Sequence, residues 1–245
     1  MFISTRMEDD QNLMRIVAAR ADGYYTVKRI FDVLFSLFLL IILSPVMFLI
    51  ALAIYVYSPG PIFFVQERVG AVRHRAGMRT KWVRKDFKLY KFRTMKLNAD
   101  PSIHRAYVKA LIENNEKQMT AIQGKEITTR KLVNDPRIIG PGKFLRKFSL
   151  DELPQFFNVL IGDMSVVGPR PAIPYEVEFF KSFHMQRLEA QPGITGLQQI
   201  TTRSSADFDL QIQKDIEYIK NQSLWLDLLI VLKTPLAIIS AKGAH

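Results

Sequence analysis

A nearly continuous apolar run from Ile30 to Tyr57 constrains the fold of this chain more than any other feature. Only Asp32, Ser36 and the pair Ser44-Pro45 interrupt it, and a helix of this length can cross a bilayer. Proline removes a helical hydrogen bond and bends the axis, while a serine hydroxyl can bond to the freed carbonyl. The sequence therefore predicts a membrane helix with a kink at Ser44 and Pro45.

The residues alone do not settle how this helix passes through the membrane, because basic residues flank it on both sides. Lys28 and Arg29 precede it. The cations that follow are Arg68, Arg73, Arg75, Arg79, Lys81, Arg84, Lys85, Lys88, Lys91 and Arg93. The positive-inside rule therefore assigns no sidedness. A re-entrant helix that returns to the same leaflet explains both flanks, and an ordinary spanning helix with a tolerated proline stays open.

The chain divides accordingly into three expected parts. Residues 1–27 form a polar tail without a secretory signal, residues 28–58 the membrane helix, and residues 59–245 one further domain. The formal charge of +11 implies anionic partners, either phosphorylated molecules or lipid headgroups. No nucleic-acid-binding motif is present, so nucleic acid is not an expected partner. Cysteine is absent, which excludes disulfides and thiolate metal sites, and the oligomeric state is left open, a homodimer included.

Most of the candidate chemical groups gather within residues 146–170. Apolar residues at helical spacing predict a helix that begins near Asp151 and ends before Gly162. These are Leu153, Phe156, Phe157 and Leu160. The N-terminus of a helix keeps a carboxylate ionised and attracts phosphate, so Asp151 can act as a nucleophile between Arg146 and Arg170 as phosphate clamps. The alternative is that Asp151 has only a structural role.

In that alternative, Asp151 only caps the helix, or Ser149 and Glu152 form a capping box. The residue types and spacing alone favour this capping role.

Two motifs in this stretch change the balance. Ser149-Leu-Asp-Glu-Leu-Pro-Gln155 and Gly162-Asp-Met-Ser-Val-Val-Gly-Pro-Arg-Pro171 resemble the signature of bacterial sugar transferases. These are the monotopic phosphoglycosyl transferases, which load a hexose 1-phosphate onto polyprenyl phosphate. The similarity extends from about Lys28 to Lys233, and several motifs agree in order.

The resemblance implies a mainly helical α+β fold. It implies a monotopic membrane protein with a Ser-Pro-kinked re-entrant N-terminal helix, a small β-hairpin and amphipathic interfacial helices, at the cytoplasmic face of the bacterial inner membrane. It also implies the chemistry. A UDP-sugar would bind with Mg²⁺ held by Asp151 and Glu152, and Asp151 would take the sugar phosphate before passing it to polyprenyl (undecaprenyl) phosphate. Such a ping-pong reaction begins exopolysaccharide, O-antigen, capsule or glycoprotein glycan assembly.

The same resemblance assigns further substrate-binding positions. Lys91 and Arg93 lie in the pattern Lys-Phe-Arg-Thr-Met, Arg137 follows Asp-Pro, and Asp215 matches an acidic position near the family's site. The residues alone allow other roles, because the two cations can be surface charges and Asp215 can pair with a basic neighbour. Asp163 is ambiguous, since it can cap a turn or approach the metal.

Other elements are expected from pattern alone. Strands are predicted at Ile62–Val65 and Phe87–Met95, with a basic loop to Lys85 between them. Helices are predicted in 96–130, 172–190, 207–220 and 224–240, the last an interfacial helix with Trp225 at headgroup level. His104 is expected at the surface.

Two other functions stay open. One is a non-enzymatic membrane-surface scaffold, and the other is a glycosyltransferase that moves the sugar without its phosphate.

Overall fold

The computed structural model describes residues 22–76, 79–98, 100, 102–124, 137–202 and 207–239. Its first element is the long helix α2, Asp22–Tyr57. The polar tail expected at 1–27 is therefore too long at its C-terminal end, because residues 22–27 already belong to α2; residues 1–21 lie outside the described part. The helix begins early because Tyr24 and Lys28 both bind the Asp227 carboxylate.

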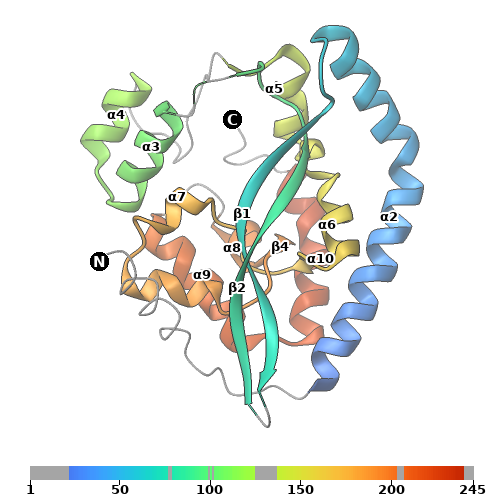
Figure 1. Ribbon diagram of the computed structural model, residues 1–245, viewed down its shortest axis with the longest axis vertical. Coiled ribbons are helices and arrows are strands. Elements are labelled where there is room, and N and C mark those ends of the chain that lie inside the picture. Colours follow the sequence, from blue (N-terminus) through green and yellow to red (C-terminus); the bar gives the residue numbers. More distant parts are fainter. Residues whose placement is uncertain are drawn as a thin grey trace.

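Helix α2 contains Pro45 and remains helical on both sides of it. Proline cannot donate to the carbonyl four residues earlier, that of Ile41, and the Ser44 hydroxyl donates to this oxygen at 2.8 Å. This hydrogen bond to the freed carbonyl is the one expected of Ser44. Figure 1 shows α2 as a bent helix whose ends lean toward the rest of the molecule. From Gly23 to Tyr57 it is long and apolar enough to cross a membrane.

One face of α2 packs against the domain and is mostly apolar, with buried polar residues in its N-terminal half. Asp32 and Ser36 are buried there, and the Asp32 carboxylate accepts a hydrogen bond from the backbone N–H of Val166 at 3.0 Å. Lys28 forms a buried ion pair of 3.0 Å with Asp227. Lys28 and Asp32 therefore help to attach α2 to the body, while the opposite face of the helix is exposed.

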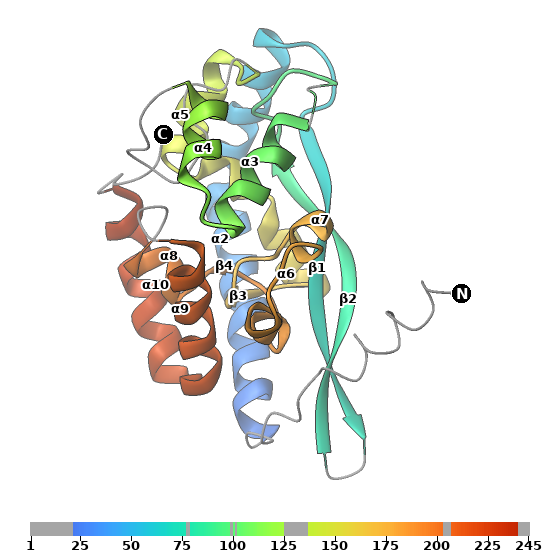
Figure 2. The same ribbon diagram turned by 90° about the vertical axis from the view of Figure 1, so that its left-hand side faces the viewer.

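A long antiparallel hairpin follows, formed by β1, Phe63–Ala76, and β2, Arg79–Phe92. Its register pairs Phe63 with Phe92 and continues to the turn, where Figures 1 and 2 show the strands projecting past the body. The expected hairpin is confirmed, but the strands are longer than predicted, because residues 66–76 and 79–85 belong to the paired strands and not to a basic loop. The exposed side chains of β2 are mostly basic, whereas β1 exposes Phe63, Phe64 and Val65, so neither strand shows a regular alternation along its whole length.

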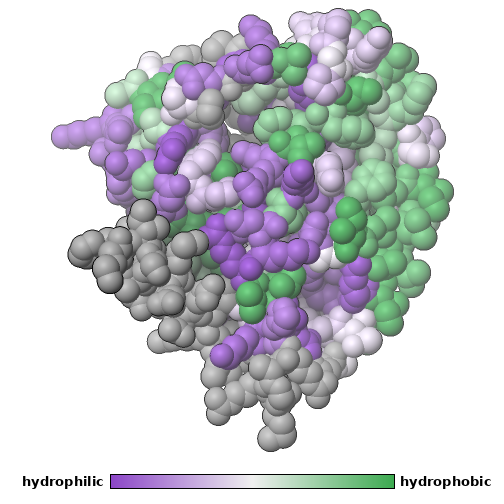
Figure 3. All heavy atoms as spheres, viewed as in Figure 1, coloured by the Kyte–Doolittle hydropathy of each residue, from purple (hydrophilic) through white to green (hydrophobic). Residues whose placement is uncertain are grey.

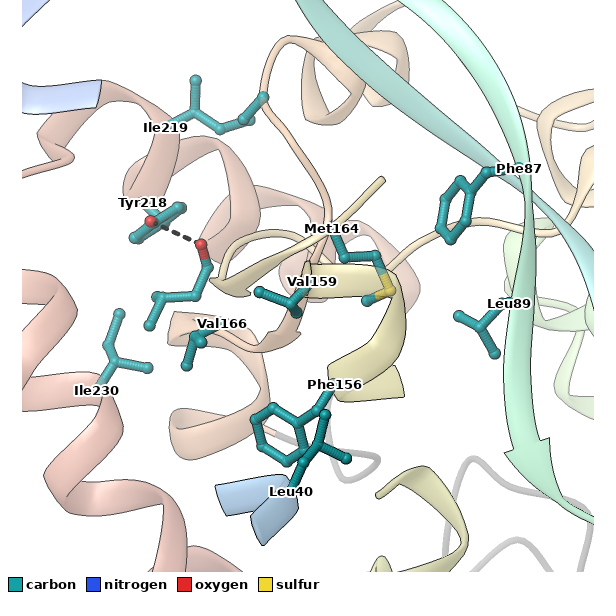
Figure 4. Packing of buried hydrophobic residues seen from close by; sticks show 12 residues of the cluster. Leu40, Phe87, Leu89, Phe156, Val159, Met164, Val166, Tyr218, Ile219 and Ile230 are labelled. Carbon is teal, nitrogen blue, oxygen red and sulfur yellow. Dashed lines mark hydrogen bonds between the residues drawn. The ribbon is translucent and has the colours of Figure 1, made fainter. Parts of the chain in front are cut away.

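The core of the domain surrounds a small parallel sheet, in which β3, Ser165–Val167, pairs with β4, Gly193–Thr195. The strands approach closely: a Cβ at Gly193 would lie 2.0 Å from the backbone nitrogen of Gly168. Figure 4 shows the surrounding apolar cluster, to which α2, β2 and α6, Gln155–Ile161, contribute, as do α9, Phe208–Asn221, and α10, Leu224–Ile239. The Tyr218 hydroxyl also donates to the Val167 carbonyl.

Short helices complete the fold around this core. They are α3, Ser102–Ile112, α4, Glu116–Gln123, α5, Gly140–Lys147, η1, Leu150–Glu152, α7, Pro174–Val177, η2, Ser182–Leu188, and α8, Leu197–Thr201. The single helix expected in 96–130 is wrong, because the chain turns at Asn114, which has a φ of 53°, and Asn115 caps α4. The helix expected at 172–190 is also wrong, since only α7 and the 3-10 helix η2 form there.

The two C-terminal helices are confirmed. Helix α9 matches the segment expected at 207–220, and α10 runs to Ile239 within the segment expected at 224–240. Trp225 of α10 is 68% exposed. In Figure 3, hydrophobic residues gather on the side where α2 lies in Figure 1, while hydrophilic residues cover the middle of the molecule. This exposed apolar side is consistent with a membrane location.

Candidate active site

Asp151 and Glu152 belong to the 3-10 turn η1, not to an α-helix. Pro154, which lacks an N–H, is the N-cap of α6, so that helix begins only at Gln155 and ends at Ile161 before Gly162. The expected helix start at Asp151 is therefore wrong, although the expected end is confirmed. The capping alternative fails as well, because neither η1 nor α6 has a side-chain N-cap hydrogen bond.

The Asp151 carboxyl is buried, with 8% of its surface exposed. Burial raises the pKa of Asp151, the positive charges of Lys91 and Arg146 oppose that rise, and Glu152 adds to it. The ionisation of this group is therefore set by burial and neighbouring charges, and not by the helix N-terminus that was expected. Desolvation disfavours the charged form, and the neighbouring cations restore part of it.

Glu152 lies between two of the expected cations. Its Oε1 atom accepts a hydrogen bond from Lys91 Nζ at 2.7 Å, and Arg170 Nη1 is 3.8 Å away. The side chains of Lys91 and Glu152 are mostly buried, whereas that of Arg170 is half exposed. Arg170 can therefore turn toward an anionic ligand without breaking the closer pair.

These groups line a cavity of about 1130 Å³. Its basic wall comprises Lys91, Lys143, Arg146, Lys147, Arg170 and Arg187. An apolar wall faces the same space, formed by Phe35, Leu39 and Leu43 of α2 and by Val231, Leu232, Pro235, Ile238 and Ile239 of α10. Asp151 and Glu152 are part of the lining, so a carboxyl pair, a cationic surface and an apolar surface share one cavity.

Four expected site residues do not line this cavity. Arg93 donates to the Ser58 carbonyl, and Arg137 donates to the Asp100 carbonyl. Asp163 accepts a bond of 2.9 Å from Lys85 on the hairpin. The fourth residue, Asp215, is buried behind the cavity wall.

Asp215 pairs with Arg187 at 2.7 Å, which is the alternative that the residues alone left open, a pair with a basic neighbour. Burial raises the pKa of Asp215 to about 6, and Arg187 opposes this rise. Arg187 also donates to the Arg170 carbonyl at 3.1 Å. The sequence analysis missed Arg187, because its segment was predicted to be an ordinary amphipathic helix. Only the tertiary structure places this cation on the cavity wall.

His104 also lines the cavity and is half-buried, so the expectation of a surface residue is wrong. Its Nδ1 atom is 2.6 Å from the Tyr175 hydroxyl. Burial lowers the pKa of His104, which favours the neutral ring.

The carboxylates of the cavity suit a metal ion that prefers oxygen ligands. Among the described residues no group of three or more His, Cys, Asp or Glu side chains gathers as a ligand cage. Mg²⁺ commonly binds through one or two carboxylates together with substrate phosphates and water. Asp151 and Glu152 fit a magnesium ion that a phosphorylated ligand helps to hold.

The family model described as bacterial sugar transferase matches residues 23–241. The chain belongs to the bacterial sugar transferase family. It is 38% identical over 219 residues to the exopolysaccharide production protein ExoY of Sinorhizobium fredii, covering 89% of this chain and 88% of that protein.

Two longer relatives match through part of their length. The undecaprenyl-phosphate galactose phosphotransferase of Salmonella typhimurium is 39% identical over 224 residues, which cover 89% of this chain and 42% of that protein. The UDP-glucose:undecaprenyl-phosphate glucose-1-phosphate transferase of Klebsiella pneumoniae is 38% identical over 215 residues, covering 84% of this chain and 39% of that protein. The chain thus spans less than half the length of these two relatives.

Proposed function

We propose that this protein transfers a sugar 1-phosphate from a UDP-sugar to polyprenyl (undecaprenyl) phosphate. The observation that carries this proposal is the position of Asp151, a buried carboxyl on a cavity wall that is cationic on one side and apolar on another. Such a cavity suits two phosphorylated substrates, one of which bears a long apolar chain. The names of the Salmonella and Klebsiella relatives describe transfers of this class.

In the first half-reaction, an oxygen of the Asp151 carboxylate attacks the sugar-proximal phosphorus. A phosphorus–oxygen bond forms to Asp151, and the bond between the attacked phosphorus and the bridging oxygen of the diphosphate breaks. UMP leaves with the electron pair of that bond. Lys91 and Arg146 favour the ionised nucleophile, and Arg170 and Arg187 stabilise the phosphoryl charge.

In the second half-reaction, a phosphate oxygen of the polyprenyl phosphate attacks the same phosphorus. The new bond completes a diphosphate, the bond to Asp151 breaks, and the carboxylate is restored. Mg²⁺, held by Asp151, Glu152 and substrate oxygens, would supply further neutralisation of phosphate charge. The product would begin assembly of an exopolysaccharide, O antigen, capsule or glycoprotein glycan.

This reaction needs the nucleophile at the depth of the lipid headgroups, because one substrate is soluble and the other is not. We place the protein at the cytoplasmic face of the bacterial inner membrane, with α2 as a re-entrant helix and α10 in the interface. Pro45 within α2, the bent course of that helix in Figure 1, its exposed apolar side and the exposed Trp225 support this placement.

The decisive test distinguishes transfer of the sugar phosphate from the two alternative functions, which are transfer of the sugar alone and a non-enzymatic scaffold. Purified protein incubated with a UDP-sugar and Mg²⁺ but no lipid should release UMP and retain a phospho-sugar on Asp151, seen as added mass in the intact protein. Asp151→Asn should lose both signals by about a thousandfold or more while circular dichroism shows a folded protein. Release of UDP would instead indicate transfer of the sugar alone. A fully functional Asp151→Asn would support a scaffold.

A further inference from the structure

Two apolar stripes line the cavity, and the proposed chemistry does not say which part of a substrate lies against them. On α2 the stripe is Phe35, Leu39 and Leu43, spaced four residues apart on one helix face. On α10 it follows Val231, Pro235 and Ile238 at similar spacing. No phosphate, nucleotide or sugar hydroxyl gains from such a surface. It favours a ligand with an apolar chain.

The apolar stripes continue to the outside of the molecule. Leu232 and Ile239 line the cavity, yet they are 62% and 70% exposed, so the cavity opens at their edge of α10. The outward faces of both helices are apolar as well, as Ile42 of α2 and Leu236 of α10 illustrate. This mouth therefore joins the Asp151 cavity to the surface that would meet lipid.

A second opening has the opposite character. Lys143, Arg146 and Lys147 of α5 line the cavity and are also exposed, so its basic wall reaches the solvent. A soluble nucleotide is complementary to this basic opening, and an apolar chain is complementary to the mouth at α10. Asp151 belongs to the lining that both share.

We infer that the passage between α2 and α10 holds the isoprene units next to the phosphate of the lipid acceptor. In this arrangement the chain enters at Leu232 and Ile239, lies between the two stripes, and presents its phosphate to the phosphorylated Asp151. The nucleotide enters and leaves over α5. This inference rests on the proposed function, and it adds that the two substrates use separate openings.

The test uses the two half-reactions of the full-length protein. Leu43→Trp and Ile238→Trp fill the passage from opposite walls, and each has a matched control on the same helix. The controls are Ile42→Trp and Leu236→Trp, which change exposed residues outside the cavity lining. UMP release without lipid should be unchanged in all four variants, which also shows that they fold. Discharge of the sugar phosphate to undecaprenyl phosphate should fall by about tenfold or more only in the two lining variants.

A lipid acceptor with a shorter chain provides a second test of the passage between α2 and α10. The lining variants should also transfer their sugar phosphate to a monophosphate that bears one or two isoprene units. The loss of rate relative to the wild-type protein should be smaller with this acceptor than with undecaprenyl phosphate, because a shorter chain must fit into the passage. The inference is overturned if either lining variant discharges to undecaprenyl phosphate at the wild-type rate. It is equally overturned if the controls slow as much, or if UMP release falls with discharge. Failure of the wild-type protein to form any adduct would refute the proposed function instead.

Discussion

The ion pair between Lys28 and Asp227 permits a stability prediction with a definite size. The pair joins α2 to α10 at 3.0 Å, with side chains only 9% and 6% exposed. Breaking a buried pair generally costs 3–5 kcal/mol, because one charge stays buried without its partner. The Tyr24 and Tyr218 hydroxyls still donate to the Asp227 carboxylate, at 2.9 and 2.7 Å. We therefore expect Lys28→Met to lower the free energy of unfolding by about 3 kcal/mol, the lower end of that range.

Denaturant unfolding in detergent micelles, followed by circular dichroism, measures this change. Lys214→Met is a matched control, because Lys214 pairs with Glu217 on the surface of α9 and its loss should cost less than about 1 kcal/mol. The double variant Lys28→Met/Asp227→Asn should lose less than the sum of its single changes, since it leaves no isolated charge. A cost for Lys28→Met no greater than that of the control would refute the reasoning.

Three further predictions concern titration and metal. Burial raises the pKa of Asp151, so the rate of UMP release should increase with pH in a range above the usual pKa of aspartate. Lys91→Met should move this rise in rate to higher pH. Single-turnover rates that do not change with pH would contradict the prediction. The folded protein keeps a proton on Asp215 up to a pKa of about 6, against an ordinary 3.8, so this group stabilises the fold fully below pH 3.8 and loses that contribution as pH rises through about 6. Asp215→Asn should flatten the fall in stability across this window, and equal slopes in the two proteins would exclude Asp215 as its source. Chelation by EDTA should stop UMP release, and added Mg²⁺ should restore it, whereas a full rate in EDTA would remove magnesium from the mechanism.

Long periodic segments were the most predictable part of the fold. The apolar run gave α2, and helical spacing gave α9 and α10, because each pattern repeats over many residues. The length of the hairpin was underestimated, since its pairing depends on backbone bonds between strands whose side chains follow no regular alternation. The start of the helix near Asp151 was predicted wrongly. Apolar spacing indicated a helix from Asp151, but α6 begins only after Pro154.

The site was predictable where its groups are close in sequence and less so where they are distant. Asp151, Glu152, Arg146 and Arg170 fall within one stretch, and all four line the cavity. Arg187 had no local signal, because its position on the wall depends on a buried ion pair with α9.

The attachment of α2 bears on any attempt to obtain a water-soluble form by trimming the N-terminus. Deleting this helix would do more than remove an anchor, because it would leave the backbone N–H of Val166 without the Asp32 carboxylate and the Asp227 carboxylate without Lys28. It would also strip one side from the chamber that contains Asp151. Solubility should therefore be sought by exchanging outward residues such as Ile42 for polar ones, with the inward face of the helix kept intact.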